Sequence, residues 1–118
     1  MFKMVFVINA SLKLRPGKLG SQTAHAAVSL YIKSKKDSII VSDIDRWVKD
    51  GQKKVVLKGT DSSQLENISK QANNSNVLSV LIRDAGFTHL TPGSTTVLGL
   101  FGKEDEINSI TGSLSLYN

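Results

Sequence analysis

The stretch from Asp84 to Gly102 holds the side chains of this sequence that are best suited to chemistry. It carries a carboxylate and several hydroxyl groups, among them those of Asp84, Thr88, Thr91, Ser94 and Thr96. Turn residues fix its path at Gly86, Pro92 and Gly93. Its first dozen residues are expected to form a loop between two strands, and loops of that length in a compact domain are usually functional. We expect this stretch to form one wall of an active site.

A second polar group is predicted on a helix at residues 18–33. Spacings near multiples of 3.6 place Lys18, Gln22, His25 and Ser29 in one narrow arc, while apolar and small residues fill most of the rest. We therefore expect a mostly buried helix with one polar stripe. Lys18 lies in the first turn, where the helix dipole favours an acid. A solvated lysine, a glutamine that satisfies backbone groups and a hydrogen-bonded core histidine remain the structural alternatives.

The sequence lacks the signatures of several enzyme classes. Cysteine is absent, which excludes thiolate nucleophiles and cysteine-ligated zinc. No hydroxyl residue follows Lys18, as a phosphate-binding loop requires, and Ser94 precedes a strand instead of following one as in a nucleophile elbow. Two isolated histidines, His25 and His89, make a poor zinc site, so we expect no metal. A lysine, a carboxylate and hydroxyls without a covalent nucleophile suit direct attack by water.

Apolar runs and helical spacings predict the elements that position these side chains. Strands are expected at residues 4–8, 54–58, 77–82 and 97–101, with a last short one at 114–117. Besides the helix at 18–33, we expect helices at 43–50 with Ser42 as cap, from the cap Asp61 to about residue 72, and from 102 to the stop at Gly112. This order predicts one α/β domain over residues 1–118, with mixed sheet polarity.

The charge of the chain is distributed unevenly. The net charge is +5, with twelve Lys or Arg against four Asp in residues 1–58 and three against six acids in the remainder. Such asymmetry indicates a basic surface that attracts nucleic acid or membrane phosphate, although a solubilising surface without a ligand is the simpler alternative. The longest apolar run, residues 4–8, is too short to cross a bilayer or to serve as a signal sequence. We expect a cytoplasmic protein without membrane contact.

Three separated motifs follow one another along nearly the whole chain. They are Gly17-Lys18-x-x-x-Gln22-x-x-His25-Ala26, then Gly51-Gln52-x-Lys54-Val55-Val56-x-Lys58, and finally Asp84-Ala85-Gly86-x-Thr88 with Pro92-Gly93-Ser94-x-Thr96-Val97-Leu98-Gly99. Together they resemble the type 2 peptidyl-tRNA hydrolase family of archaea and eukaryotes, as does the ending at residues 111–117. The chain departs from the usual family pattern at residues 20–24 and 100–103.

The resemblance implies an activity and a fold. The activity is hydrolysis of the ester between a peptide and the 3′ end of tRNA, which frees the tRNA and needs no cofactor. The implied fold is a three-layer α/β/α sandwich around a mixed, mostly parallel four-stranded sheet. A non-catalytic RNA- or protein-binding adaptor with the same fold is the alternative. The oligomeric state is left open, with a homodimer as one option.

The resemblance also suggests which residues act. The catalytic candidates are Lys18, Gln22, His25, Asp84, Thr88 and Thr96. Candidates for contact with the acceptor-stem phosphates are Lys13, Arg15, Lys53, Lys54 and Lys58.

Each catalytic candidate has an expected role. Lys18 would stabilise the oxyanion, and Asp84, an ordinary aspartate being a weak base near neutral pH, would orient Lys18 and the water unless burial raises its pKa. The hydroxyls of Thr88 and Thr96 would fix the water or the ester carbonyl. Gln22 and His25 would position the peptide or the terminal adenosine.

Overall fold

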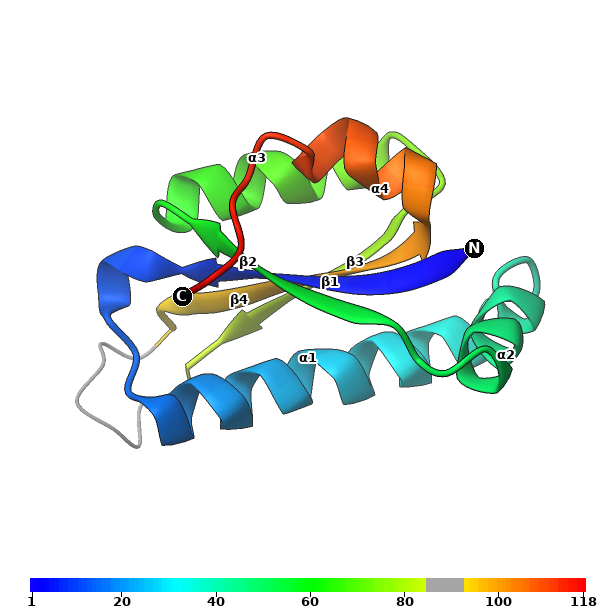
Figure 1. The fold of residues 1–118 in the computed structure, drawn as a ribbon, viewed down its shortest axis with the longest axis horizontal. Helices are drawn as coiled ribbons and strands as arrows, with labels where there is room; N and C mark the ends of the chain where they lie inside the picture. The colour runs from blue at the N-terminus through cyan, green and yellow to red at the C-terminus, as the bar shows by residue number, and fades with distance from the viewer. Residues whose placement is uncertain (85–92) are drawn as a thin grey trace.

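The structure, a computed structural model, describes residues 1–84 and 93–118 (Figure 1). Four strands, four α-helices and one short 3₁₀ helix follow one another along this part of the chain. In order they are β1 (Phe2–Asn9), η1 (Ala10–Leu12), α1 (Pro16–Lys35), α2 (Val41–Lys49), β2 (Lys54–Gly59), α3 (Ser62–Asn73), β3 (Leu78–Arg83), β4 (Thr95–Lys103) and α4 (Glu104–Thr111).

The four strands form one mixed sheet in the order β2-β1-β4-β3. Strands β1 and β2 pair in parallel, whereas β4 is antiparallel to both of its neighbours. The α/β fold and the mixed polarity are confirmed, but the prediction of a mostly parallel sheet is wrong. The reason is that β4 lies between β1 and β3 and runs antiparallel to both, so the parallel pairing among the described strands is confined to β1 and β2.

Helices lie on both faces of the sheet, with α1 and α2 on one face and α3 and α4 on the other (Figure 1). The protein has a hydrophobic core on each face of the sheet, and alternate side chains of β1 belong to them in turn. Phe6 and Ile8 pack on the α1 side, and Val5 and Val7 pack on the α3 side. Both faces of β1 are therefore buried, as its continuous apolar run predicts. This arrangement holds the N-terminal end of α1 near the ends of the central strands.

The helix α1 packs on the sheet along a narrow line. Its buried residues recur every four positions, at Gln22, Ala26, Leu30 and Ser34, while Val28 on another side is 58% exposed. The prediction of a mostly buried helix is therefore wrong. The physical reason is that one helix face covers β3 and β4, and the small and apolar side chains on the other faces remain at the surface.

Local capping accounts for the other differences from the predicted elements. Pro16 starts α1 two residues early, at a position where its missing N–H costs no hydrogen bond. Ser42 does not cap α2; instead Asp37 Oδ1 accepts hydrogen bonds from the N–H groups of Ile39 and Ile40. The cap at Asp61 is confirmed, since its side chain accepts from the N–H of Gln64 at 2.9 Å.

The C-terminal tail does not form the short strand predicted at 114–117. It makes one isolated antiparallel bridge, between Leu57 and Leu116. Two backbone hydrogen bonds flank it, from Lys58 N to Ser115 O at 2.9 Å and from Tyr117 N to Val56 O at 3.0 Å. The tail thus covers the outer edge of β2 without extending the sheet.

Replacing Gly99 by alanine is expected to lower the free energy of unfolding by about 1 to 3 kcal/mol, because the added methyl group overpacks a tight contact. A Cβ there would lie 3.0 Å from Leu30 Cδ1 and 3.3 Å from Ala26 Cβ, both on α1. Urea unfolding followed by circular dichroism measures the change. Gly20→Ala is the matched control, since Gly20 lies in α1 with nothing within 4 Å of its Cβ position, and alanine should stabilise the helix there. Equal midpoints for the two variants would contradict this packing.

Candidate active site

Lys18 and Asp84, which are 66 positions apart, form a buried ion pair. Lys18 lies in the first turn of α1, and Asp84 follows the last residue of β3. Lys18 Nζ contacts Asp84 Oδ1, with 18% of the lysine side chain and 0% of the aspartate side chain exposed. The carboxylate compensates for the unfavourable position of a lysine in the first turn of a helix. Since an ammonium group has three donors, Lys18 retains capacity to bind an oxygen of a substrate or water.

The backbone of Asp84 is fixed by two hydrogen bonds to residues 93 and 94. Asp84 N donates to Ser94 O at 2.8 Å, and Gly93 N donates to Asp84 O at 2.9 Å. Gly93 has φ +84°, in the left-handed region that glycine adopts without strain. These bonds fix the backbone from which the carboxylate reaches Lys18 on α1. Removing one partner of a buried ion pair lowers the free energy of unfolding of a protein by about 3 to 5 kcal/mol.

A β-bulge turns Thr96 toward α1. Ile82 pairs with Val97 while Arg83 pairs with Thr95, so Thr96 is an extra residue in β4 with no residue opposite it on β3. In a regular strand Thr96 would share a face with Leu98, which packs in the α3-side core. Bulges commonly re-aim a side chain beside an active site. Here the bulge brings the Thr96 hydroxyl to the α1 side of the sheet.

Thr96 and Gln22 form a second buried pair. Thr96 Oγ1 donates to Gln22 Oε1 at 2.7 Å and also lies 3.2 Å from Ile82 O. A hydroxyl has one hydrogen and serves one acceptor at a time, and the shorter contact is the one to Gln22. When Thr96 occupies Oε1, the amide nitrogen of Gln22 is the group left to donate. Gln22 is one helical turn from Lys18, so the two pairs lie on the same face of α1.

The structure brings four of the six catalytic candidates together: Lys18, Gln22, Asp84 and Thr96. It does not bring His25 among them. His25 is exposed on α1, so the alternative of a core histidine is also wrong for this residue. Thr88 lies outside the described residues, and its predicted role stays a prediction. The sequence analysis missed Asn9, whose signal was a polar residue directly after the buried run of β1.

The five cationic candidates fall into two groups at opposite ends of β2. Lys58 pairs with Ile8 near the end of β1, from which the chain continues to Lys13 and Arg15 before α1. Lys54 pairs with Met4, four residues or about 13 Å from Lys58 along the strand. The first group, Lys13, Arg15 and Lys58, is therefore at the Lys18 end of the sheet.

The second group is engaged with other side chains. Lys53 forms an ion pair with Glu104, and its hydrogen bond lowers the pKa of that carboxyl. Lys54 Nζ donates to Gln52 O at 3.0 Å and lies 5.2 Å from the centre of the Trp47 ring. Trp47 is buried and meets Phe101 edge-on, so it is a packing anchor.

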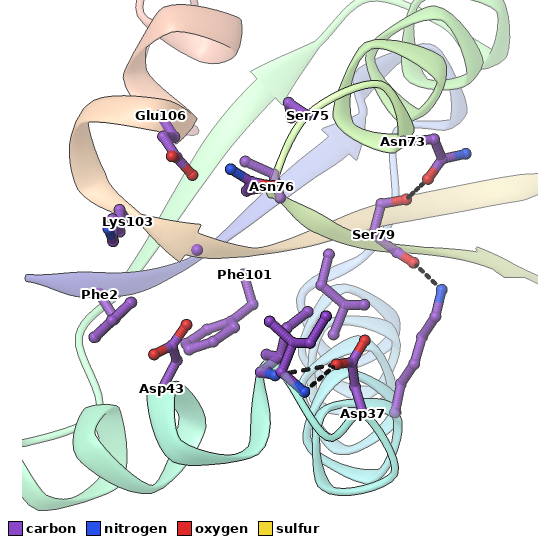
Figure 2. Close-up of a pocket in the computed structure, with 16 residues that line it drawn as sticks. Phe2, Asp37, Asp43, Asn73, Ser75, Asn76, Ser79, Phe101, Lys103 and Glu106 are labelled. Carbon is purple, nitrogen blue, oxygen red and sulfur yellow. Dashed lines mark hydrogen bonds between the residues drawn. The ribbon is translucent and has the colours of Figure 1, made fainter.

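A pocket of about 480 Å³ lies at the other end of the sheet and contains none of the predicted site residues (Figure 2). Figure 2 shows two hydrogen bonds between residues that line this pocket. Lys33 Nζ donates to Ser79 O, and Ser79 Oγ donates to Asn73 Oδ1. These bonds tie α1 and the end of α3 to β3. We therefore place the candidate active site at the Lys18 end, where the buried ionic and hydroxyl groups converge.

Two further features concern the described residues as a whole. In residues 1–84 and 93–118, no three His, Asp or Glu side chains are grouped so that they could hold a metal ion. None of the helices in this part of the chain has the length and hydropathy needed to span a membrane.

An α/β fold that presents a lysine–carboxylate pair beside a threonine–glutamine pair suits a hydrolase that activates water without a covalent nucleophile. The family model described as peptidyl-tRNA hydrolase PTH2 matches residues 2–117. A peptidyl-tRNA hydrolase of Methanopyrus kandleri is 40% identical over 98% of each chain. A probable peptidyl-tRNA hydrolase 2 of Caenorhabditis elegans is 39% identical over 97% of this chain and 36% of its own length. The chain belongs to the peptidyl-tRNA hydrolase PTH2 family.

A solved structure supports the fold alone. A protein of unknown function from Agrobacterium tumefaciens superposes with a TM-score of 0.67, at 13% identity, over 99% of this chain and 98% of its own.

Proposed function

We propose that this protein hydrolyses the ester bond between the peptide and the 3′ end of tRNA in peptidyl-tRNA and so releases free tRNA for reuse in translation. Family membership over residues 2–117 supports this activity. The observation that carries the proposal is the buried Lys18–Asp84 pair. In this pair the carboxylate of Asp84 holds the ammonium group of Lys18 at one end of the sheet. The site also offers the acceptors and donors that an attacking water needs.

The reaction needs a nucleophilic water and a stabiliser for the tetrahedral oxyanion. The water oxygen attacks the acyl carbon and the bond from that carbon to the ribose oxygen breaks. One proton of the water passes to the ribose oxygen, which leaves as the 3′ hydroxyl, and the water oxygen stays on the acyl carbon as the new carboxyl group of the peptide. Lys18 stabilises the negative oxygen of the intermediate, and Asp84 holds Lys18 in place. Electrostatic stabilisation of this kind is usually the largest single contribution to such a reaction.

The other site residues position the reactants. Thr96 orients the Gln22 amide through the 2.7 Å hydrogen bond, and the amide nitrogen of Gln22 donates to the peptide. His25 is exposed on α1 and contacts the terminal adenosine outside the buried site in this proposal. Thr88 contributes a second hydroxyl to the water or the ester carbonyl.

The acceptor stem binds at the basic residues around this end of the sheet. Lys13, Arg15 and Lys58 are all exposed, and no ion pair engages them within the described residues. Phosphate contacts of this kind give sequence-tolerant affinity that depends on salt. Lys53 and Lys54 lie farther away and contribute to the same substrate more weakly.

Replacing Lys13, Arg15 and Lys58 together by alanine is expected to raise KM for peptidyl-tRNA and leave kcat largely intact. Each lost phosphate contact removes about 0.7 to 0.9 from the slope of log affinity against log salt concentration. Steady-state kinetics between about 50 and 200 mM salt measure both effects. The matched control replaces three exposed lysines elsewhere, Lys36, Lys49 and Lys70, which changes the net charge equally. Equal shifts in slope for the two triple variants would rule out a localised phosphate site.

The activity itself is tested with the purified protein on N-acetylated aminoacyl-tRNA, with free aminoacyl-tRNA as the comparison substrate. We expect hydrolysis of the N-acetylated substrate and much slower hydrolysis of the free one. An inactive protein that still binds tRNA would instead support the adaptor alternative.

We also propose a cytoplasmic location, where translation supplies the substrate.

We further propose that the protein forms a homodimer. The side of α1 turned away from the sheet exposes Val28, Tyr31 and Ile32, at 58%, 39% and 49%, and a second copy would bury this surface. Sedimentation equilibrium should give twice the chain mass, and a monomer at all concentrations would exclude the dimer.

A further inference from the structure

Asn9 lies buried behind the candidate site with its hydrogen-bonding groups engaged on both sides. Only 1% of the residue is exposed. Its Oδ1 accepts from Ser11 N at 3.1 Å and from Ser11 Oγ at 2.6 Å. Its Nδ2 donates to Thr95 O at 2.8 Å and to Ser62 Oγ at 3.2 Å. These four contacts fix the amide in one orientation, with a donor directed at the backbone of β4.

The bond to Thr95 O acts where β4 departs from regular geometry. Thr95 is the residue before the extra residue of the bulge, and Arg83 Nη1 also donates to its hydroxyl at 3.0 Å. Thr95 and Asn9 lie on the α3 side of the sheet, since Asn9 reaches Ser62 at the start of α3. Anchoring Thr95 on that side leaves Thr96 to turn toward α1, where it meets Gln22.

We propose that Asn9 is a positioning residue for the hydrolytic reaction, and that it acts by holding the β4 bulge so that the Thr96 hydroxyl reaches Gln22. The inference rests on the proposed function, but it concerns a residue that does not touch the substrate. Asn9 fixes the backbone of Thr95, the bulge follows from that anchor, and the Thr96–Gln22 pair follows from the bulge.

The test compares Asn9→Asp and Asn9→Leu with the wild type on N-acetylated aminoacyl-tRNA. Asn9→Asp keeps the shape and the acceptor for Ser11 but replaces the donor to Thr95 O by an oxygen. Asn9→Leu removes both functions at similar volume. Misplacement of a site by about 1 Å can lower the rate by about 100-fold, so we expect kcat to fall about 10- to 100-fold with KM little changed.

A double-mutant cycle with Thr96→Val separates positioning from general loss of stability. If Asn9 acts through Thr96, the double variant Asn9→Leu/Thr96→Val has the kcat of Thr96→Val alone. Multiplying losses, or an unchanged kcat in both Asn9 variants, would overturn the proposal.

Two control variants complete the experiment. Ser62→Ala removes the other partner of Asn9 Nδ2 and should leave kcat unchanged, because the bond to Thr95 remains. Ile68→Val weakens the α3-side core but leaves the hydrogen bond from Asn9 to Thr95 O in place. We therefore expect kcat to be unchanged again at a temperature where the protein is folded. A loss of kcat in Ile68→Val equal to that in Asn9→Leu would reduce Asn9 to a structural role. An inactive wild type would refute the proposed function and this inference with it, whereas an active wild type with active Asn9 variants would refute this inference alone.

Discussion

Replacing Lys18 by methionine should lower kcat for peptidyl-tRNA hydrolysis by about 100- to 1,000-fold with little change in KM, because removing one oxyanion stabiliser costs about 2.7 to 4 kcal/mol in the transition state. Methionine keeps an unbranched side chain of similar length but has no charge. The measurement is steady-state kinetics on N-acetylated aminoacyl-tRNA. A protein in which Lys18 only binds tRNA phosphate would instead show a raised KM and an unchanged kcat.

Lys18→Met also leaves the Asp84 carboxylate buried without its cation, so a control for folding is needed. Circular dichroism and urea unfolding establish the temperature range in which the variant is native. Lys18→Arg is the second variant: it keeps the charge but replaces a compact ammonium by a planar guanidinium, and we expect an intermediate kcat. If Lys18→Arg had full activity, a point charge in a defined position would not be required.

Asp84→Asn should lower kcat by about 10- to 100-fold, less than the loss in Lys18→Met, because the carboxylate positions the ammonium without taking the proton itself. Asparagine matches the shape of aspartate and retains one oxygen toward Lys18. The second readout is kcat measured as a function of pH between about pH 5 and 8, the range in which most proteins are most stable. In our account this dependence is the same in the variant and the wild type.

A general-base role for Asp84 gives a different pattern. The variant would lose about 100- to 10,000-fold in rate, and the rise of kcat with pH that reports ionisation of the base would disappear. Asp84→Glu is a useful companion, since it keeps the charge but displaces it by one methylene group. Restored activity in Asp84→Glu would contradict the tight positioning seen in the buried pair.

Much of the fold follows from local patterns in the sequence. The continuous apolar run at residues 4–8 predicts a strand covered on both faces, and β1 is one. Asp61 predicts the start of α3 because its carboxylate can accept from a backbone N–H three residues on, as it does. Such features depend on neighbours in the chain. The order of the strands depends on pairing between distant segments. No short segment of the sequence therefore predicts that β4 lies between β1 and β3.

The same distinction applies to the candidate site. Helical spacing places Lys18 and Gln22 on one face of α1, and the structure agrees. Spacing fails for His25, because the buried residues of α1 follow every fourth position from Gln22 to Ser34, and this line turns away from the side that His25 shares with Lys18. The bulge at Thr96 and its anchor Asn9 arise from a register shift between two strands, which sequence periodicity does not reveal.

The central claim is that Lys18 and Asp84 act as one unit, and a double-mutant cycle on kcat tests it most directly. The four proteins are the wild type, Lys18→Met, Asp84→Asn and the double variant, in which the buried pair is neutral. We predict that the double variant is as slow as Lys18→Met and no slower, since Asp84 works only through the ammonium. A double variant slower by the product of the two single losses would contradict the account.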